Sequence, residues 1–169
     1  MIKNFSTRVK TWILKMHWYQ LVLISYLFNL LAILFMALFF LLVFNIQIGA
    51  SRTNEMSIGT DWTILFNAAI TVPIFETWLN QKLVFQVIRK LFKNKLGSHF
   101  CWVYCLFSAF IFGLLHPFDE AYVVATFFCG LTFSFVYIFA KYKRWHAFWL
   151  VVLIHGMQNA TAFISRFVQ

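Results

Sequence analysis

The chain has 169 residues, of which 62% are hydrophobic, 21% are aromatic and only 11% are charged. A soluble domain of this length carries about 25% charged residues, so the composition excludes a water-exposed surface over most of the chain. The formal net charge is +9, but the basic residues cluster beside apolar runs, which is typical of membrane topology signals rather than nucleic-acid binding. We therefore expect a single all-α membrane domain over residues 1–169, with membrane lipid as a partner and no nucleic acid.

The first predicted element is an amphipathic segment. Basic and apolar residues alternate over residues 1–18, which predicts a helix lying on the cytoplasmic surface of the membrane. An apolar run then extends from Leu21 to Ile48. This run is too long for the core of a signal peptide, about 7–15 residues, and it predicts a first transmembrane span. Residues 49–61 are predicted to form a polar loop.

Four further apolar segments follow along the chain. The second span is predicted from Trp62 to about Leu79 and continues into an amphipathic stretch from Lys82 to Lys95. The third span covers Phe100 to His116, the fourth Tyr122 to Ala140, and the fifth His146 to about Phe167. Each approaches the length of about 20 residues that crosses the hydrocarbon core. The predicted fold is a polytopic transmembrane helix bundle of about five spans.

The distribution of charges agrees with this layout. Eleven of the 14 lysines and arginines fall into three clusters, which are Lys3, Arg8, Lys10 and Lys15; Arg89, Lys90, Lys93 and Lys95; and Lys141, Lys143 and Arg144. All three clusters lie on one side of the membrane, and such a bias marks the cytoplasmic side. We therefore expect a multi-pass protein of the cell membrane with a cytoplasmic N-terminus. Four of the five acidic residues fall on the opposite side, and the fifth, Glu76, lies inside the second span.

Glu76 is a candidate functional residue, because a charged carboxylate within the hydrocarbon region costs several kcal/mol and is rarely kept there without a role. Two histidines lie in later spans, His116 at the end of the third and His155 inside the fifth. Asn159 follows His155 by four residues, so the two side chains share one face of a helix. The sequence thus predicts a polar cluster built from three separate spans.

This set of side chains suits two kinds of chemistry. A glutamate and a histidine together hold and deprotonate a water molecule, with the carboxylate as general base. The second histidine and the asparagine then donate hydrogen bonds to the oxyanion of a tetrahedral intermediate. Alternatively, Glu76, His116 and His155 have the ligand types of a two-histidine, one-carboxylate metal site. This interpretation ranks second because no HExxH-like spacing supports it. A structural alternative is a protonated Glu76 that bonds a neighbouring helix.

At these residues the chain resembles the CAAX protease and bacteriocin-processing (Abi) family of intramembrane glutamic proteases. Residues Pro73–Gln81 fit the frame of the family's first motif, which is EExxxR after a proline. Residues Phe112–His116 match FxxxH, and residues His155–Asn159 match HxxxN/D. The three matches occur in order, each in its own span, and they place a protease-like core over residues 62–167.

The resemblance implies a role for each matching position. Glu76 would be the general base, and His116 would help to position and activate the water. His155 and Asn159 would form the oxyanion hole. The implied reaction is hydrolysis of a peptide bond in a small peptide or a membrane-protein substrate, without a metal or other cofactor. Bacterial members of the family are associated with bacteriocin processing and self-immunity.

Two differences from the first motif leave an alternative open. Thr77 stands where the second glutamate is usual, and Gln81 stands where the arginine is usual. Together these changes remove an ion pair that would steady the motif. The alternative is a non-catalytic immunity or scaffold protein of the same fold. A small transporter or channel component is disfavoured, because the spans show no internal repeat and no paired broken helices.

Overall fold

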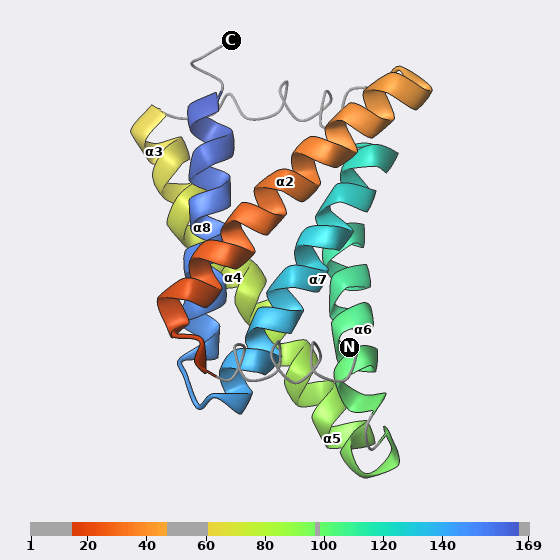
Figure 1. The fold of residues 1–169 in the computed structure, drawn as a ribbon, viewed down its shortest axis with the longest axis vertical. Helices are drawn as coiled ribbons and strands as arrows, with labels where there is room; N and C mark the ends of the chain where they lie inside the picture. Colours follow the sequence, from red (N-terminus) through yellow and green to blue (C-terminus); the bar gives the residue numbers. More distant parts are fainter. Residues whose placement is uncertain (1–14, 47–60, 97–98, 166–169) are drawn as a thin grey trace, which may run out of the picture.

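The computed structural model describes residues 15–46, 61–96 and 99–165, and these are helical almost throughout (Figure 1). The helices are α2 Trp18–Phe44, α6 Phe100–Leu114, α7 Glu120–Tyr142, α8 Ala147–Ile164, and one continuous segment made of α3 Asp61–Phe66, η2 Asn67–Thr71, α4 Val72–Thr77, η3 Trp78–Leu83 and α5 Val84–Leu96. The predicted all-α bundle is confirmed for these residues. The predicted surface helix over 1–18 and the polar loop over 49–61 fall almost entirely outside the described ranges.

Among the described residues, four helices are long and apolar enough to cross a membrane, and they are α2, the segment Trp62–Phe92, α7 and α8. The predicted third span is the shorter helix α6, whose 15 residues extend for about 22 Å. Helix α6 ends at Leu114, two residues earlier than predicted. The reason is Pro117, which disfavours a helical conformation in the residue before it.

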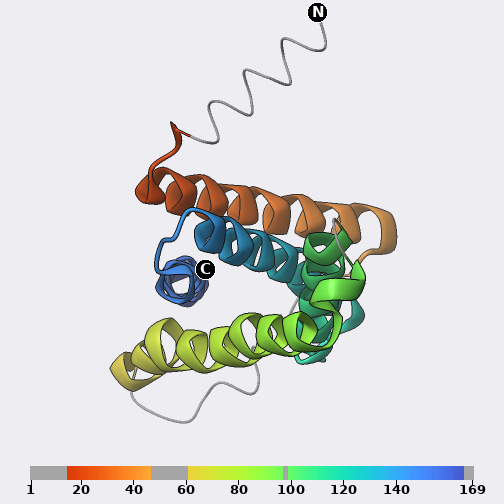
Figure 2. The ribbon, with the colours of Figure 1, turned by 90° about the horizontal axis from the view of Figure 1, so that it is seen from below.

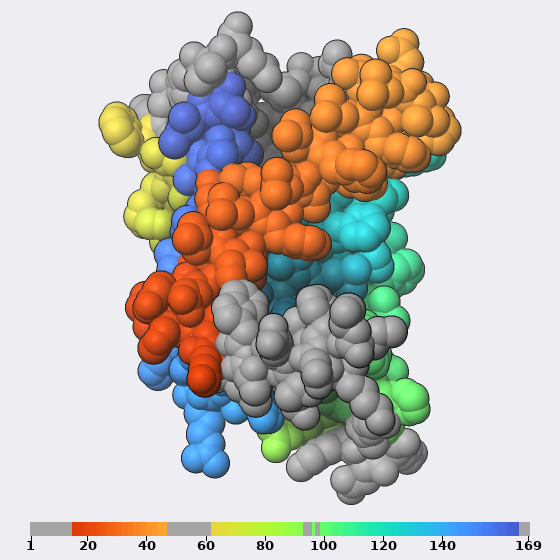
Figure 3. Space-filling model, in the orientation of Figure 1, coloured from red at the N-terminus to blue at the C-terminus, as the bar shows by residue number. Residues whose placement is uncertain are grey.

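The helices pack around α7 and α8. Helix α2 lies across one side of this pair, the α3–α5 segment lies on the other side, and α6 packs against α7 and α5 (Figures 1 and 2). Buried side chains between these helices form the core, the largest being Tyr104, Tyr137, Phe112, Phe133 and Ile154. The space-filling view shows α2 lying diagonally across the front of the molecule (Figure 3). Most of its apolar side chains remain exposed, as expected of a helix that faces lipid.

Two polar side chains of α2, the partly buried Tyr26 and the buried Asn29, differ in their hydrogen bonding. The Thr161 hydroxyl on α8 donates to the Met157 carbonyl at 2.9 Å and therefore accepts from the Tyr26 hydroxyl at 2.6 Å. Asn29 is fully buried, and neither of its amide atoms has a hydrogen-bond partner among the described residues. Leaving a polar group buried and unpaired costs about 1–3 kcal/mol.

We expect Asn29→Leu to raise the thermal unfolding temperature of the detergent-solubilised protein, because leucine fills similar space without an unpaired amide. Tyr26→Phe is the matched variant, and its expected effect on stability is the opposite. It removes a hydrogen bond that is made and should lower the free energy of unfolding by about 1 kcal/mol. An Asn29→Leu chain less stable than the wild type would show that the amide has a partner in the membrane.

The helix that carries Glu76 contains two π-helical stretches, η2 before it and η3 after it. Such stretches are rare and frequently occur at functional sites, because they displace backbone carbonyls from the regular ladder of helical hydrogen bonds. Neighbouring helices donate to three of these carbonyls. The pairs are Asn159 Nδ2 to Ala68 O at 2.9 Å, Ser108 Oγ to Asn80 O at 2.7 Å, and the Tyr104 hydroxyl to Gln81 O at 3.1 Å. Glu76 therefore lies between two places where its helix is bonded to the rest of the bundle.

A glycine allows α8 to approach η2 closely. A Cβ atom on Gly156 would fall well inside contact distance of the Ala69 carbonyl oxygen. Asn159 follows Gly156 by three residues, so the two lie on adjacent parts of the same helix face. The close approach at Gly156 thus brings the Asn159 amide to the Ala68 carbonyl.

Candidate active site

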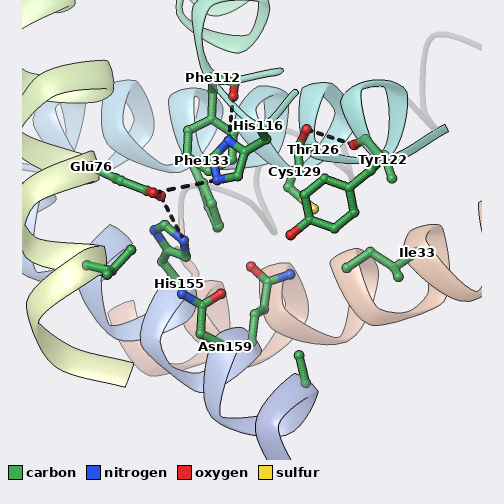
Figure 4. A pocket seen from close by; sticks show the side chains of 14 residues that line it. Ile33, Glu76, Phe112, His116, Tyr122, Thr126, Cys129, Phe133, His155 and Asn159 are labelled. Atoms are coloured by element: carbon green, nitrogen blue, oxygen red, sulfur yellow. Dashed lines mark hydrogen bonds and ion pairs between the residues drawn. The ribbon is translucent and has the colours of Figure 1, made fainter. Parts of the chain in front are cut away.

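The Glu76 carboxylate faces two histidines from other helices. Its Oε1 atom lies 3.5 Å from His116 Nε2, and its Oε2 atom lies 3.4 Å from His155 Nε2 (Figure 4). The Glu76 side chain is 23% exposed, against 12% for His116 and 5% for His155. The structure therefore brings these three predicted residues together in a largely buried place.

His116 is held by the turn that follows α6. Its Nδ1 atom lies 2.7 Å from the carbonyl oxygen of Phe112. A carbonyl only accepts, so Nδ1 carries a proton and Nε2 is the atom directed at Glu76. In the neutral ring, Nε2 presents a lone pair. A lone pair and a carboxylate attract each other only through a shared hydrogen. This geometry therefore suits a hydrogen held on one of the two atoms, or a water molecule beside them that donates to both Nε2 and Oε1.

His155 is positioned by aromatic rings within the bundle. Its ring centroid lies 4.9 Å from that of Phe133 on α7 and 5.6 Å from that of Phe112 on α6. The Phe112 ring also lies 4.6 Å from the His116 ring. These apolar walls exclude bulk water, which strengthens every electrostatic interaction of the carboxylate with the imidazoles.

Asn159 has a backbone partner in this structure. Its Nδ2 atom donates to the Ala68 carbonyl in η2 at 2.9 Å. An amide nitrogen carries two hydrogens, so one donor site remains after this bond is made. The contact that the structure shows joins α8 to η2. The oxyanion role of Asn159 stays a prediction.

One cavity of about 160 Å³ contains all four predicted residues (Figure 4). Further lining side chains come from α2, α4, α7 and α8, and they are Ile33, Val72, Tyr122, Ala125, Thr126, Cys129, Gln158 and Ala162. None of these eight residues is among the site residues predicted from the sequence. The feature of the sequence that could have identified some of them is the presence of Thr126, Cys129 and Gln158 inside otherwise apolar spans. Gln158 is 7% exposed, and its Nε2 atom has no hydrogen-bond partner among the described residues.

The two residues that depart from the family motif lie outside this cavity. Thr77 and Gln81 are both fully buried, and neither lines the cavity. A glutamate and an arginine at these places would have to pair, because breaking a buried ion pair costs about 3–5 kcal/mol. Replacing both charges with neutral side chains avoids an unpaired charge. Because neither residue lines the cavity, the double departure does not change the side chains that do.

The metal interpretation receives no support from this geometry. Within the part of the chain that the structure describes, no group of three His, Cys, Asp or Glu side chains is arranged to hold a metal ion. Glu76, His116 and His155 are arranged instead as a carboxylate with an imidazole nitrogen near each oxygen. This arrangement suits proton transfer, since each oxygen has a group that holds or supplies a hydrogen.

Comparison with known proteins agrees with the motifs and the fold. Residues 58–161 match the family described as Type II CAAX prenyl endopeptidase Rce1-like. This match covers more than half of the 169 residues and includes Glu76, His116, His155 and Asn159. No curated protein and no solved structure matches the chain. With a multi-pass helical fold and the three motifs inside the matched region, the chain belongs to the Rce1-like family of type II CAAX prenyl endopeptidases, which are membrane proteases.

Proposed function

We propose that this chain is an intramembrane glutamic endopeptidase that hydrolyses a peptide bond in a small peptide or a membrane-protein substrate. The observation that carries the proposal is the Glu76 carboxylate, held between two imidazole nitrogens at 3.4 and 3.5 Å in a cavity. Family membership supports a protease. What we propose beyond family membership is the role of each residue, the substrate, and bacteriocin processing or self-immunity as the physiological setting.

In the proposed reaction, Glu76 removes a proton from a water molecule that also hydrogen-bonds to His116 Nε2. The Phe112 carbonyl holds the His116 ring so that this nitrogen faces the carboxylate. The water oxygen attacks the carbonyl carbon of the substrate and forms a tetrahedral intermediate. Glu76 then transfers its proton to the leaving nitrogen, and the C–N bond breaks. The products are a carboxylic acid, which retains the second proton of the water, and an amine. That proton then passes to the amine, which leaves a carboxylate and an ammonium group, so atoms and protons balance.

The negative charge of the intermediate requires nearby donors. His155 and the second amide hydrogen of Asn159 supply them in this proposal, since both residues line the cavity that contains Glu76. Removing one such donor costs about 10²–10³-fold in kcat in other hydrolases. The apolar surroundings of His155 increase the effect of each donor because the site contains few competing dipoles.

The proposal is tested by searching for a cleavage product in membranes that contain the full chain. The probes are a CAAX peptide in prenylated and unprenylated forms, together with a library of unmodified peptides, all incubated in water enriched in heavy oxygen. Hydrolysis places one heavy oxygen in the new carboxylate, which mass spectrometry detects. Membranes without the chain are the control. Product that forms equally in both membranes, or product without the label, contradicts the proposal.

We expect the activity to withstand chelators, because carboxylate and imidazole side chains perform every proton transfer in the proposed reaction. Membranes are treated with a chelator of divalent cations, and the rate of product formation is compared before and after. An unchanged rate supports acid–base catalysis by Glu76. Loss of activity that added zinc restores would instead favour the metal interpretation of Glu76, His116 and His155.

A non-catalytic immunity or scaffold protein is the second candidate. The observation in its favour is the neutral pair Thr77 and Gln81 in the first motif. It predicts that Glu76 tolerates substitution and that only changes in packing abolish function. Substitution of Glu76 therefore separates the two candidates.

A further inference from the structure

The charged side chains of the described helices separate toward opposite ends of the bundle. One end, here called the basic end, carries Lys15, Arg89, Lys90, Lys141, Lys143 and Arg144. Helices α2, α6 and α8 begin at this end, and α5 and α7 finish there (Figure 1). The opposite end, here called the acidic end, carries Asp119 and Glu120 at the start of α7. Asp119 Oδ1 accepts from the Tyr122 backbone nitrogen at 2.6 Å and so caps α7.

The catalytic cavity lies toward the acidic end. On α7 its lining begins at Tyr122, two residues after the helix starts, and on α8 it reaches Ala162, two residues before the helix ends. His116 lies beyond the end of α6, in the turn that leads to Asp119. All these positions belong to the half of the bundle that is remote from the basic end.

Packed side chains close the cavity on its other side. The lining residue on α7 nearest to the basic end is Phe133, and nine further residues lead to Tyr142, a distance of about 14 Å. Val136, Tyr137 and Ala140 in this stretch are at most 2% exposed. A packed core thus lies between the Glu76 carboxylate and the basic end, and the turns at the acidic end are the nearer route to water.

Lysines and arginines near the ends of spans mark the cytoplasmic side of a membrane protein. Every lysine and arginine in the described ranges lies at the basic end or on the part of the α3–α5 segment that leads to it. We infer that the catalytic cavity opens toward the extracytoplasmic side of the membrane. This inference rests on the proposed function, because that function is what makes the cavity catalytic. It narrows the substrates to exported peptides and to segments of membrane proteins that lie at the outer surface.

Thiol labelling tests this orientation without a substrate. The native residues Cys101, Cys105 and Cys129 are replaced by alanine, and single cysteines are then introduced as Glu120→Cys at the acidic end and Lys141→Cys at the basic end. Both parent side chains are exposed. Spheroplasts that express each full-length variant are treated with a membrane-impermeant maleimide, with and without permeabilisation. We expect the Glu120→Cys chain to react in intact spheroplasts and the Lys141→Cys chain to react only after permeabilisation.

The reverse pattern, or equal labelling of both variants in intact spheroplasts, would overturn the inference. A reporter fused to the C-terminus of the full chain provides a second measurement, because α8 ends at the acidic end. Alkaline phosphatase at that position should be active and a fluorescent protein should be dark, and the opposite result overturns the orientation. Failure of the protease proposal is recognised separately, as unchanged cleavage by the Glu76→Gln chain, and it leaves the labelling result intact.

Discussion

Replacing Glu76 with glutamine is expected to lower kcat by about 10²–10⁴-fold, the usual contribution of a general base. Glutamine has nearly the same shape, so it preserves the packing of the α3–α5 segment while its amide cannot take a proton from water. The Glu76 side chain is partly exposed to the cavity, and the chain should therefore accumulate in membranes at the wild-type level. Product formation per molecule is measured by mass spectrometry at matched expression.

The matched control for this variant is Glu120→Gln. Glu120 is exposed at the start of α7 and does not line the cavity, so its substitution should leave the rate unchanged. Glu76→Asp is an informative intermediate, because it keeps the carboxylate but withdraws it from both imidazole nitrogens. A Glu76→Gln chain that cleaves as well as the wild type would eliminate the glutamic mechanism and favour the non-catalytic alternative.

The sequence predicted which residues meet, although it did not predict how they reach the same depth. Counting 1.5 Å per residue places His155 about 16 Å from Arg144 and His116 about 25 Å from His99. The structure nevertheless brings both rings within 3.5 Å of Glu76. The difference is absorbed at the basic end, where the end of α5 lies lower than the end of α7 (Figure 1).

The spans were predictable because burial in lipid demands long apolar runs, and those runs are visible in composition. The residues at which the spans begin and end were less predictable. The first span was predicted from Leu21 to Ile48, whereas α2 covers Trp18–Phe44. Apolar character continues past the last helical residue, and the Asn45 backbone adopts a left-handed conformation that ends the helix.

The π-helical stretches and the cavity could not be predicted. Residues Asn67–Thr71 and Trp78–Leu83 carry no local pattern that distinguishes a π turn from an α turn. Donors from distant helices, such as Asn159 and Ser108, stabilise the displaced carbonyls, and this tertiary information is invisible in one sequence. The same limit explains why Gln158 was missed, since its place in the cavity lining depends on how α8 packs.

Substituting Gly156 with alanine is expected to impair stability and catalysis together. The added methyl group would meet the Ala69 carbonyl oxygen in the backbone of η2, and a backbone atom cannot rotate aside as a side chain does. Overpacking of this kind costs about 1–3 kcal/mol. Relief requires α8 to move away from η2, which lengthens the Asn159–Ala68 hydrogen bond and shifts His155 relative to Glu76. A displacement of 1 Å at a catalytic group is enough to cost about 10²-fold in rate.

Two comparison variants separate the steric effect from its consequences. Leu153→Ala, one turn earlier on α8, removes a side chain that is 44% exposed, so it should change the unfolding temperature little and leave the rate intact. Asn159→Leu removes the hydrogen bond without adding bulk at the glycine. If the displacement of α8 is the cause, Gly156→Ala should lower both the thermal unfolding temperature in detergent and kcat, with a loss of stability greater than that of Asn159→Leu. A Gly156→Ala chain with wild-type stability and rate would show that α8 and η2 are further apart in the membrane than this packing implies. The Phe112 and Phe133 rings alone would then have to position His155.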